Sequence, residues 1–443
     1  GAKSDIITPS FDKDMTVAHT ELVNILKQKG TGPTMSEPLR LEQLDRLTIL
    51  LADPNENPVT QATLLTAIRM LGQSDAESAW YGSLAQRYRK LPSALWFLFE
   101  APSTPFLKWT HQVMAHQNLD AKTARKAFDA VLDDAVPATQ KAAFLEAERI
   151  KRETLDENVA CLGACWDKTT HTAVDLPLLI DFAASYDGLN RNSYVSPFAA
   201  ATLAAMGYPV VLHGTDAIGP KNGQNPYKIL VAAGKTPIRP ISDLVADLCH
   251  PQIGWAYLDQ SQFCPALFAL KSLRFDMVKR PLLATVEKLV SPVRAKKNAL
   301  LTSYTHPPYR DMMTQLLITC GHFDDIILVR GVEGGIQFPV DRRCPVTTIR
   351  NDVAQDDFVE VPPTLASERV LANYALTASD SVKAGIAALS GEKNMTYKAI
   401  VHLVAAALSE FGIQSYGIAL QATETHIASG AALAHWKAGM NHA

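Results

Sequence analysis

Two glycine-bearing loops in the middle of the chain have the residue types of a phosphate cradle. The first is a turn that starts at Asp187-Gly188 and is followed by an alanine-rich helical stretch. The second runs from His213-Gly214 to Lys221, directly after a short apolar run. Glycine lets backbone N–H groups approach an anion, and the start of a helix adds a favourable dipole. These five residues are therefore candidate contacts for a phosphate-bearing ligand.

Two histidines near the ends of predicted strands each have two possible roles. His213, beside a glycine, is suited to face a ligand as a hydrogen-bond donor or acid, and equally suited to cap its own loop. His306 follows the apolar run 300–302, and Pro307 favours an extended backbone that would fix its ring toward the same cleft. A Pro-Pro turn with a solvent-facing His306 is the alternative. The sequence leaves these roles open.

A basic run lies in residues 271–297, where eight lysines and arginines face two acidic residues, a local charge of +6. Such an asymmetry is suited to the phosphates of a nucleotide or of a nucleic-acid backbone. Lys279, Arg280 and Arg294 are the candidate nucleic-acid contacts. Only Phe275 is available for base stacking, and a solvated helix face is the alternative interpretation.

The composition is that of a globular protein without an overall basic character. Of the 443 residues 47% are hydrophobic and 20% charged, and the formal net charge is −3, so no global field attracts nucleic acid or membrane. No apolar run reaches membrane-spanning length, and no secretory signal is evident. Cys161 and Cys165 lie one helical turn apart, without a second pair to complete a zinc site. We expect a cytoplasmic protein with reduced thiols and no membrane partner.

The first part of the chain is predicted to be helical and to contain a repeat. An apolar stripe at helical spacing follows Asn57-Pro58, where Asn57 can cap the helix and Pro58 suits its first turn. About eighty residues later the pattern recurs with a P-x-T-Q start, an arginine near the helix end and a capped acidic second helix. We interpret 39–85 and 121–165 as copies of one hairpin in a helical domain 1–170. Chance likeness between two amphipathic hairpins is the alternative.

From residue 171 onward short apolar runs alternate with helical stretches. These runs are 178–180, 210–212, 254–258, 300–302 and 326–329. The alternation predicts an α/β domain, 171–443, whose mostly parallel sheet is covered by helices. We expect part of this domain's chain to return to the helical domain. Binding sites in such sheets lie beyond the carboxyl ends of the strands, which is where both glycine loops fall.

Over most of its length the chain resembles the anthranilate phosphoribosyltransferase family. The family's loop K-H-G-N-R-x-x-S-S-K-S-G is matched at His213-Gly214 and at Lys221. Its G-T-G-G-D turn corresponds to residues 183–187, with Tyr186 where backbone would touch pyrophosphate. The resemblance implies the nucleoside phosphorylase/phosphoribosyltransferase fold, a helical domain beside a larger α/β domain, and a homodimer formed through the helical domain.

The same resemblance places further ligand contacts and a metal site. The family's N-x-S-T helix start falls on positions that include Ser193 and Ser196, and Arg274 matches the spacing of the arginine that holds anthranilate. The family's G-x-x-G-x-D-E segment holds magnesium through its two acids, but Ile336 and Gln337 stand there in this chain. Magnesium is therefore a possible cofactor whose usual acidic ligands are replaced, and the resemblance assigns no catalytic residue.

A divergent, glycosyltransferase-like branch of this fold, some of whose members bind nucleic acid, is more similar still. Its motifs are matched by S-Y-D-G at 185–188, V-V-L-H-G at 210–214, S-Y-T-H-P-P-Y at 303–309 and R-G-V-E-G at 330–334. Four separated motifs in the same order make the resemblance specific.

Two functions follow from the resemblance and stay open. One is a phosphoribosyl or glycosyl transferase with an altered or weak activity on a phosphorylated sugar or nucleotide-like molecule, because the loss of two metal-binding acids disfavours the family's own reaction. The other is a non-catalytic protein that binds a nucleotide or nucleic acid in the same cleft. The sequence does not decide whether the chain turns over a substrate.

Overall fold

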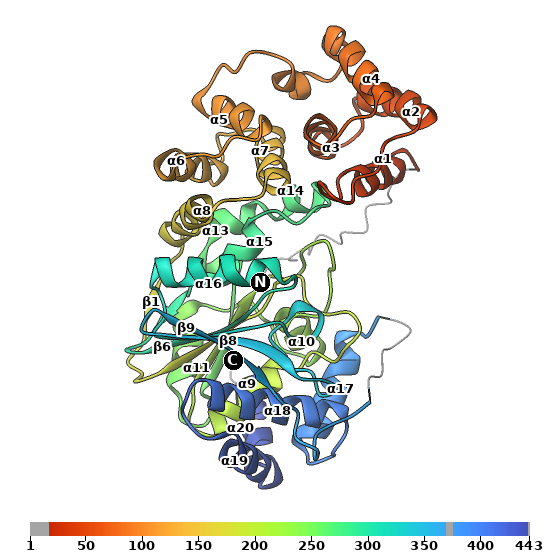
Figure 1. Ribbon diagram of the computed structural model, residues 1–443. Coiled ribbons are helices and arrows are strands. Elements are labelled where there is room, and N and C mark those ends of the chain that lie inside the picture. The colour runs from red at the N-terminus through yellow and green to blue at the C-terminus, as the bar shows by residue number, and fades with distance from the viewer. Residues whose placement is uncertain (1–16, 369–374, 442–443) are drawn as a thin grey trace, which may run out of the picture. The chain divides into compact units, whose positions relative to one another are not determined.

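The computed structural model (Figure 1) describes residues 17–368 and 375–441, which divide into two compact units. The helical unit comprises the described residues up to 118 together with 134–152 and 273–279. The last of these segments enters the helical unit from the middle of the chain.

The remaining described residues form the sheet unit. It comprises 119–133, 153–272 and the described residues from 280 onward. This division differs from the boundary near residue 170 that the sequence indicated, because α6 (Ala121–Val131) and α8 (Leu155–Asp167) group with the sheet.

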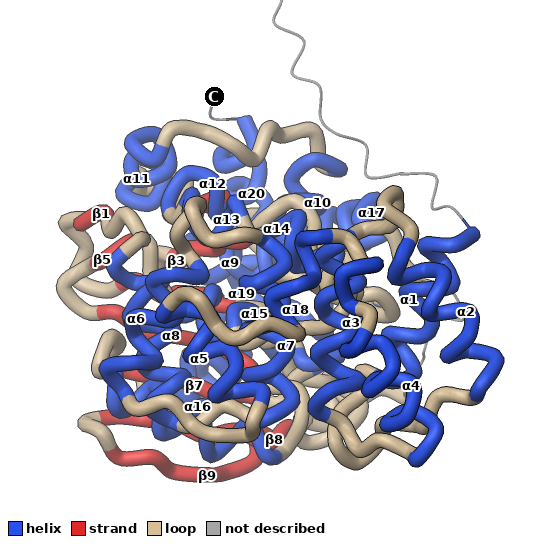
Figure 2. The backbone as a smooth tube through the Cα atoms, turned by 90° about the horizontal axis from the view of Figure 1, so that it is seen from above, coloured by secondary structure: helices blue, strands red, loops and turns tan. Residues whose placement is uncertain are grey.

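A seven-stranded sheet is the centre of the sheet unit, with the strand order β4-β3-β2-β6-β7-β8-β9. The strands are β2 (Leu179–Ala183), β3 (Val210–Gly214), β4 (Trp255–Asp259), β6 (Asn298–Ser303), β7 (Asp325–Val329), β8 (Cys344–Arg350) and β9 (Val353–Val359). The first five in the spatial order are parallel, β8 and β9 are antiparallel, and β9 lies at one edge (Figure 2). The predicted α/β fold with a mostly parallel sheet is confirmed.

The five apolar runs of the sequence became β2, β3, β4, β6 and β7, whereas β8 and β9 were missed. The pattern of β9 explains this, because six of its seven residues are exposed and three of these six are polar. The separate two-stranded pair of β1 (Thr172–Ala173) and β5 (Val293–Arg294) is too short to give a pattern.

Alternation along the strands divides the side chains between two faces of the sheet. Ile180, Phe182 and Leu212 belong to the large apolar core that includes Phe198 of α9 (Ser196–Ala205) and Trp436 of α20 (Ala431–Asn441). The intervening residues, such as Asp181 and His213, therefore point to the opposite face. In Figure 1 the C-terminal helices α18 (Met395–Glu410), α19 (Tyr416–Ala428) and α20 lie on one side of the sheet and α16 (Pro308–Cys320) on the other.

Shorter segments complete the sheet unit. They are α10 (Pro226–Ala232), α11 (Ile241–Cys249), α12 (Gln260–Phe263), α13 (Pro265–Ala269), α15 (Leu283–Val286), α17 (Ala378–Leu389), η3 (Glu287–Leu289) and η4 (Val332–Gly334).

The helical unit is built from helices. They are α1 (Val17–Lys29), α2 (Leu41–Ala52), α3 (Pro58–Met70), α4 (Asp75–Gln86), η1 (Tyr88–Lys90), η2 (Ser93–Leu98), α5 (Pro105–Met114) and α7 (Ala138–Lys151), with most of α14 (Lys271–Asp276). The predicted cap is confirmed, because Asn57 Oδ1 accepts from the N–H groups of Val59 and Thr60.

One buried hydrogen-bond pattern occurs twice, once in each of the hairpins interpreted as repeats. Glu77 on α4 accepts from the N–H of its own N-cap residue at 2.8 Å and from the Leu39 N–H at 3.0 Å. Glu157 on α8 accepts from its own N-cap residue and from the Leu119 N–H, both at 2.8 Å. In both cases 38 residues separate the glutamate from the leucine. The recurrence supports the duplication as an interpretation of these hairpins.

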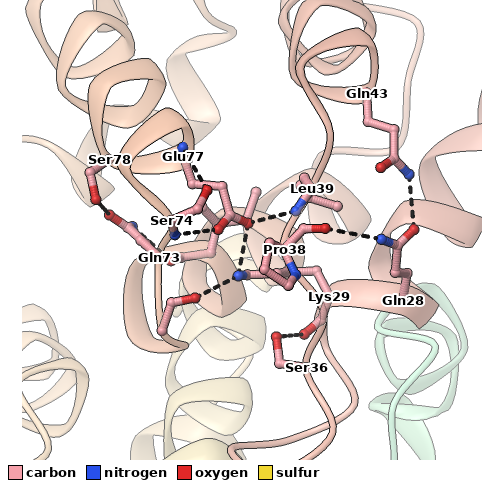
Figure 3. A network of polar contacts seen from close by, with 12 residues as sticks. Gln28, Lys29, Ser36, Pro38, Leu39, Gln43, Gln73, Ser74, Glu77 and Ser78 are labelled. Atoms are coloured by element: carbon pink, nitrogen blue, oxygen red, sulfur yellow. Dashed lines mark hydrogen bonds and ion pairs between the residues drawn. The ribbon is translucent and has the colours of Figure 1, made fainter.

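In the first hairpin the buried carboxylate also has a buried counter-ion (Figure 3). Lys29 Nζ lies 2.8 Å from Glu77 Oε1 and donates to the Gly72 carbonyl at 2.9 Å, and both side chains are fully buried. Burial raises the pKa of Glu77, but hydrogen bonds from Lys29 and two backbone N–H groups outweigh it and lower the pKa overall.

Candidate functional site

Three loops leave one end of the sheet. Residues 184–195 follow β2, residues 215–225 follow β3 and residues 330–343 follow β7. Because these strands are parallel, their carboxyl ends lie at the same edge. The first two loops are joined by the Gly223 N–H, which donates to the Asp187 carbonyl at 2.8 Å. The glycine loops identified in the sequence thus lie side by side.

The glycines of these loops allow the two backbones to approach each other. Gly188 has φ of +74°, and a Cβ there would lie 1.9 Å from the Gln224 carbonyl oxygen. A Cβ on Gly223 would lie 2.6 Å from the Leu189 carbonyl oxygen. The N–H groups of both glycines are hydrogen-bonded within the protein, that of Gly188 to the Ser185 carbonyl at 3.2 Å. Gly188 therefore has a packing role in addition to any contact with a ligand.

Charged side chains gather around the Asp187 turn. Arg280 donates to the buried carboxylate of Asp187. Lys221 Nζ donates to the carbonyls of Glu333 at 2.6 Å and Gly188 at 3.4 Å. Burial lowers the pKa of Lys221, and Arg280 lowers it further, while Asp187 and Glu333 act in the opposite direction. The turn thus brings together a carboxylate and two cations.

Lys288 adds a third cation to this group. Its side chain is buried, and its Nζ donates to the Ser303 carbonyl. Burial is the main cause that lowers its pKa to about 8, and repulsion from Arg280 and Lys221 adds to the shift. Asp187 is among the groups that oppose it. We call Lys221, Arg280 and Lys288 the cation cluster.

A buried hydrogen-bonded chain holds His213. Its Nε2 lies 2.9 Å from Asp181 Oδ1, and its Nδ1 lies 2.5 Å from the hydroxyl of Tyr186. That hydroxyl also donates to the Glu287 carbonyl at 3.2 Å. Burial raises the pKa of Tyr186 well above its usual value, so the phenol stays protonated. Both ring nitrogens of His213 are engaged inside the protein, which matches the structural alternative for this histidine, and Gly214 continues β3 beside it.

The positions that correspond to the family's magnesium acids are engaged in a different way. Gln337 Oε1 accepts from the Val195 N–H at 2.9 Å, and its Nε2 donates to the Ser193 carbonyl at 3.0 Å. Ile336 is fully buried, and Ser196 is buried in the first turn of α9. Neither 336 nor 337 has a carboxylate, and the amide of Gln337 fastens the start of α9 to the third loop. These side chains do not fit a magnesium ion at these two positions.

A pocket of about 240 Å³ opens beside the first and third loops. Its lining includes Arg191, Asn192, Ser193, Glu333 and Arg342. Polar side chains of both signs therefore face a space large enough for several water molecules.

The remaining candidates from the sequence belong to other segments of the chain. Arg274 is buried within the part of α14 that belongs to the helical unit. His306 is exposed just before α16, where its ring lies 6.5 Å from that of Tyr309. His306 is therefore exposed to solvent, as the alternative interpretation has it. Arg274 and the Asp187 turn belong to different units.

The basic run is not a single helix face. Lys279 belongs to the helical unit and donates to the Lys27 carbonyl at 3.3 Å. Arg280 and Arg294 belong to the sheet unit, and Arg294 donates to the His322 carbonyl at 2.6 Å. All three candidate nucleic-acid contacts thus make hydrogen bonds within the protein.

Two features are absent from the described residues. No group of three or more His, Cys, Asp or Glu side chains in 17–368 and 375–441 is placed to hold a metal ion. No helix in the same residues has the length and apolar character needed to cross a membrane.

Three site residues were not predicted. Asp181 lies inside the buried strand β2, where a carboxylate among apolar neighbours is itself a signal of a specific partner. Asn225 caps α10 before Pro226 and donates to the Thr215 carbonyl at 2.8 Å, a role that the Asn-Pro pair indicates. Lys288 was counted only as part of the basic run, since nothing local reveals its burial.

Comparison with known proteins relates the chain to one family. Residues 108–168 match the family model of the "Glycosyl transferase family, helical bundle domain". An uncharacterized protein of Aquifex aeolicus is 29% identical over 259 residues, which covers 58% of this chain and 77% of that protein. The uncharacterized protein YbiB of Escherichia coli is 26% identical over 261 residues, with 57% and 77% covered. The anthranilate phosphoribosyltransferase of Rhizobium meliloti is 25% identical over 212 residues, with 47% and 60% covered.

Solved structures share the fold. Anthranilate phosphoribosyltransferase from Thermus thermophilus superposes with a TM-score of 0.61 at 19% identity, covering 75% of this chain and 98% of that one. The enzyme from Saccharomyces cerevisiae in complex with PRPP and Mg gives a TM-score of 0.62 at 16% identity, covering 76% and 97%. At these identities the similarity establishes the architecture, in agreement with the sheet order described above.

Proposed function

We propose that this chain, a member of an anthranilate phosphoribosyltransferase-like family with divergent uncharacterized members, binds a phosphorylated sugar or nucleotide-like anion at its cation cluster. The observation that carries the proposal is Lys288, a buried lysine whose pKa is lowered to about 8 beside two further cations. Perturbed groups at the carboxyl end of a parallel sheet are typical of ligand sites. An anion placed beside Lys221 and Arg280 would relieve the repulsion between these cations.

The ligand class is supported by the relatives. The yeast enzyme has been solved in complex with PRPP and Mg. In this chain Lys221 lies on the second loop, which matches the family's motif, and Arg280 donates to Asp187 of the first loop. Lys and Arg are the side chains that most readily hold phosphate oxygens. We therefore infer that the phosphate groups of such a ligand, rather than an aromatic acceptor, supply most of the binding energy.

The mode of binding should differ from the family's in its use of metal. Gln337 and Ile336 offer no carboxylate, so we infer that magnesium is not held by these two positions. Without that charge neutralisation a pyrophosphate leaving group is poorly stabilised. We therefore infer a protein that binds phosphate-bearing molecules and whose transferase activity on such a ligand is altered or weak.

No observation favours nucleic acid as a second ligand. The candidate nucleic-acid contacts of the sequence are Lys279, Arg280 and Arg294. All three side chains make hydrogen bonds within the protein.

Titration calorimetry with phosphoribosyl pyrophosphate tests the proposal. Lys221→Gln keeps a donor for the two carbonyls and removes the charge, and it should weaken binding by about tenfold or more, the equivalent of one charged hydrogen bond. Lys393→Ala, an exposed lysine of the sheet unit, is the matched control and should change nothing. Chelation of magnesium should change the affinity by less than about threefold. No binding by the unmodified protein, or equal binding by Lys221→Gln, would refute the proposal.

A further inference from the structure

Glu333 occupies a backbone conformation that is unusual for its residue type. Its φ is +51° and its ψ +25°, in the left-handed region, between Gly331 and Gly334. Such a conformation costs a non-glycine residue on the order of 1–3 kcal/mol unless neighbouring contacts compensate it. We therefore expect specific contacts of Glu333 that compensate this conformational cost.

The compensating contacts are three hydrogen bonds to its carboxylate. Glu333 Oε2 accepts from the Asn190 N–H, and Oε1 accepts from the Arg191 N–H and from Asn192 Nδ2, each at 2.8 Å. All three donors belong to consecutive residues of the first loop. The backbone of Glu333 is also held in place, because its main-chain carbonyl accepts a hydrogen bond from Lys221 Nζ at 2.6 Å.

This set of donors is the kind that binds a phosphate group. Successive backbone N–H groups that converge on one point form an anion-binding nest, and a side-chain amide adds a third donor. Glu333 is thus an anion bound in cis. The nest also borders the pocket of about 240 Å³, whose lining includes Arg191, Asn192 and Glu333, so a ligand in that pocket can reach the same donors.

We propose that the nest formed by Asn190, Arg191 and Asn192 is a second phosphate site, closed by the Glu333 carboxylate and opened when a phosphate group displaces it. The inference rests on the proposed function and adds to it a means of control. Because the competent, open state is only partly populated, the apparent affinity for phosphate is reduced by that fraction. Release of Glu333 also frees the segment whose carbonyl holds Lys221, which couples the nest to the cation cluster.

Two substitutions test the closure in complementary ways. Glu333→Gly removes the carboxylate and suits the left-handed backbone, whereas Glu333→Gln keeps the size and removes the charge. Titrated with inorganic phosphate in a phosphate-free buffer, both variants should bind at least about tenfold more tightly than the unmodified protein. Glu392→Gln, an exposed glutamate of the sheet unit, is the control and should match the unmodified protein.

A measurement on the unmodified protein covers the case in which a variant does not fold. Saturating inorganic phosphate should shift the amide resonances of Asn190 and Arg191, because the N–H groups exchange a carboxylate for a phosphate oxygen. Unchanged phosphate affinity in folded Glu333 variants, or amide resonances of the nest that do not respond to phosphate, would overturn the inference.

The outcome separates this inference from the proposed function. Binding of phosphoribosyl pyrophosphate that depends on Lys221, with no gain in the Glu333 variants, would leave the proposed function standing and remove only the closure. A gain of phosphate affinity in Glu333→Gly, with no binding of the sugar pyrophosphate by the unmodified protein, would leave the nest standing and remove the proposed function.

Discussion

Two buried lysines in different units show how differently the protein treats a buried positive charge. In the helical unit Lys29 Nζ lies 2.8 Å from Glu77 Oε1, so the buried positive charge of the lysine is balanced by the buried carboxylate. Lys288 in the sheet unit has the Ser303 carbonyl as its hydrogen-bond acceptor, and two other cations lie nearby. The first arrangement is that of a structural ion pair, and the second is the one that we propose as an anion site.

Two glutamates, Glu77 and Glu333, show a similar contrast for a negative charge. Glu77 accepts backbone N–H groups from a helical position and has a cation beside it. Glu333 accepts backbone N–H groups from a strained position and borders a pocket. Hydrogen bonds from backbone N–H groups to a carboxylate thus stabilise the fold in the helical unit, and we propose that those of Glu333 control binding.

The largest effect is expected where the compensated pair is broken. Lys29→Met leaves the Glu77 carboxylate buried without its cation, and this should cost about 3–5 kcal/mol of unfolding free energy. Urea unfolding followed by circular dichroism measures the loss. The double variant Lys29→Met/Glu77→Gln keeps an acceptor oxygen for the Leu39 and Ser74 N–H groups without the charge, so it should recover part of the loss. A loss below about 1 kcal/mol in the single variant would mean that the pair is not the structural element described here.

The lowered pKa of Lys288 should make the stability of the protein depend on pH. The pKa of Lys288 is about 8 in the folded protein and 10.5 without perturbation. Between these values the unfolded chain binds more protons, so stability should rise with pH, by a total of about 3 kcal/mol, relative to Lys288→Met. Unfolding free energies of both proteins at about pH 7 and about pH 10 test this. Parallel changes in the two proteins would contradict the lowered pKa.

A smaller loss is expected for the second copy of the glutamate pattern. Glu157→Ala removes the acceptor of the Leu119 N–H and half of a capping box, and buried donors left without a partner cost about 1–3 kcal/mol. Thermal unfolding of this variant beside Glu77→Ala measures both. A loss below about 0.5 kcal/mol for Glu157→Ala would contradict a stabilising role of its buried carboxylate.

The smallest effect on stability is expected at Glu333. Glu333→Gly loses three hydrogen bonds but relieves the left-handed strain, so the unfolding free energy should change by less than about 1 kcal/mol. Thermal unfolding in phosphate-free buffer is the measurement. A loss comparable to that of Lys29→Met would make Glu333 a structural residue like Glu77 and end the contrast between them.

Local patterns in the sequence predicted much of the fold. Apolar runs predicted the five parallel strands, and Asn57-Pro58 predicted a capped helix start, because both depend on residues close together in the chain. β9 was not predicted because its exposed residues mix polar and apolar types and form no apolar run.

The candidate site was predicted in its location but not in its contacts. The glycine loops do converge, yet the partners of Asn190 and Val195 lie more than 140 residues away, at Glu333 and Gln337. Spacing along the chain contains no information on such pairs. The burial of Lys288 and the engagement of His213 likewise depend on tertiary packing, so the sequence left their roles undecided.

A crystal structure of the protein with phosphoribosyl pyrophosphate tests the central claim most directly. The account predicts phosphate oxygens within hydrogen-bond distance of Lys221 and Arg280, with the Glu333 side chain displaced from the Asn190 and Arg191 amides. A ligand bound elsewhere, with Arg280 still on Asp187 and Glu333 still in its nest, would contradict it.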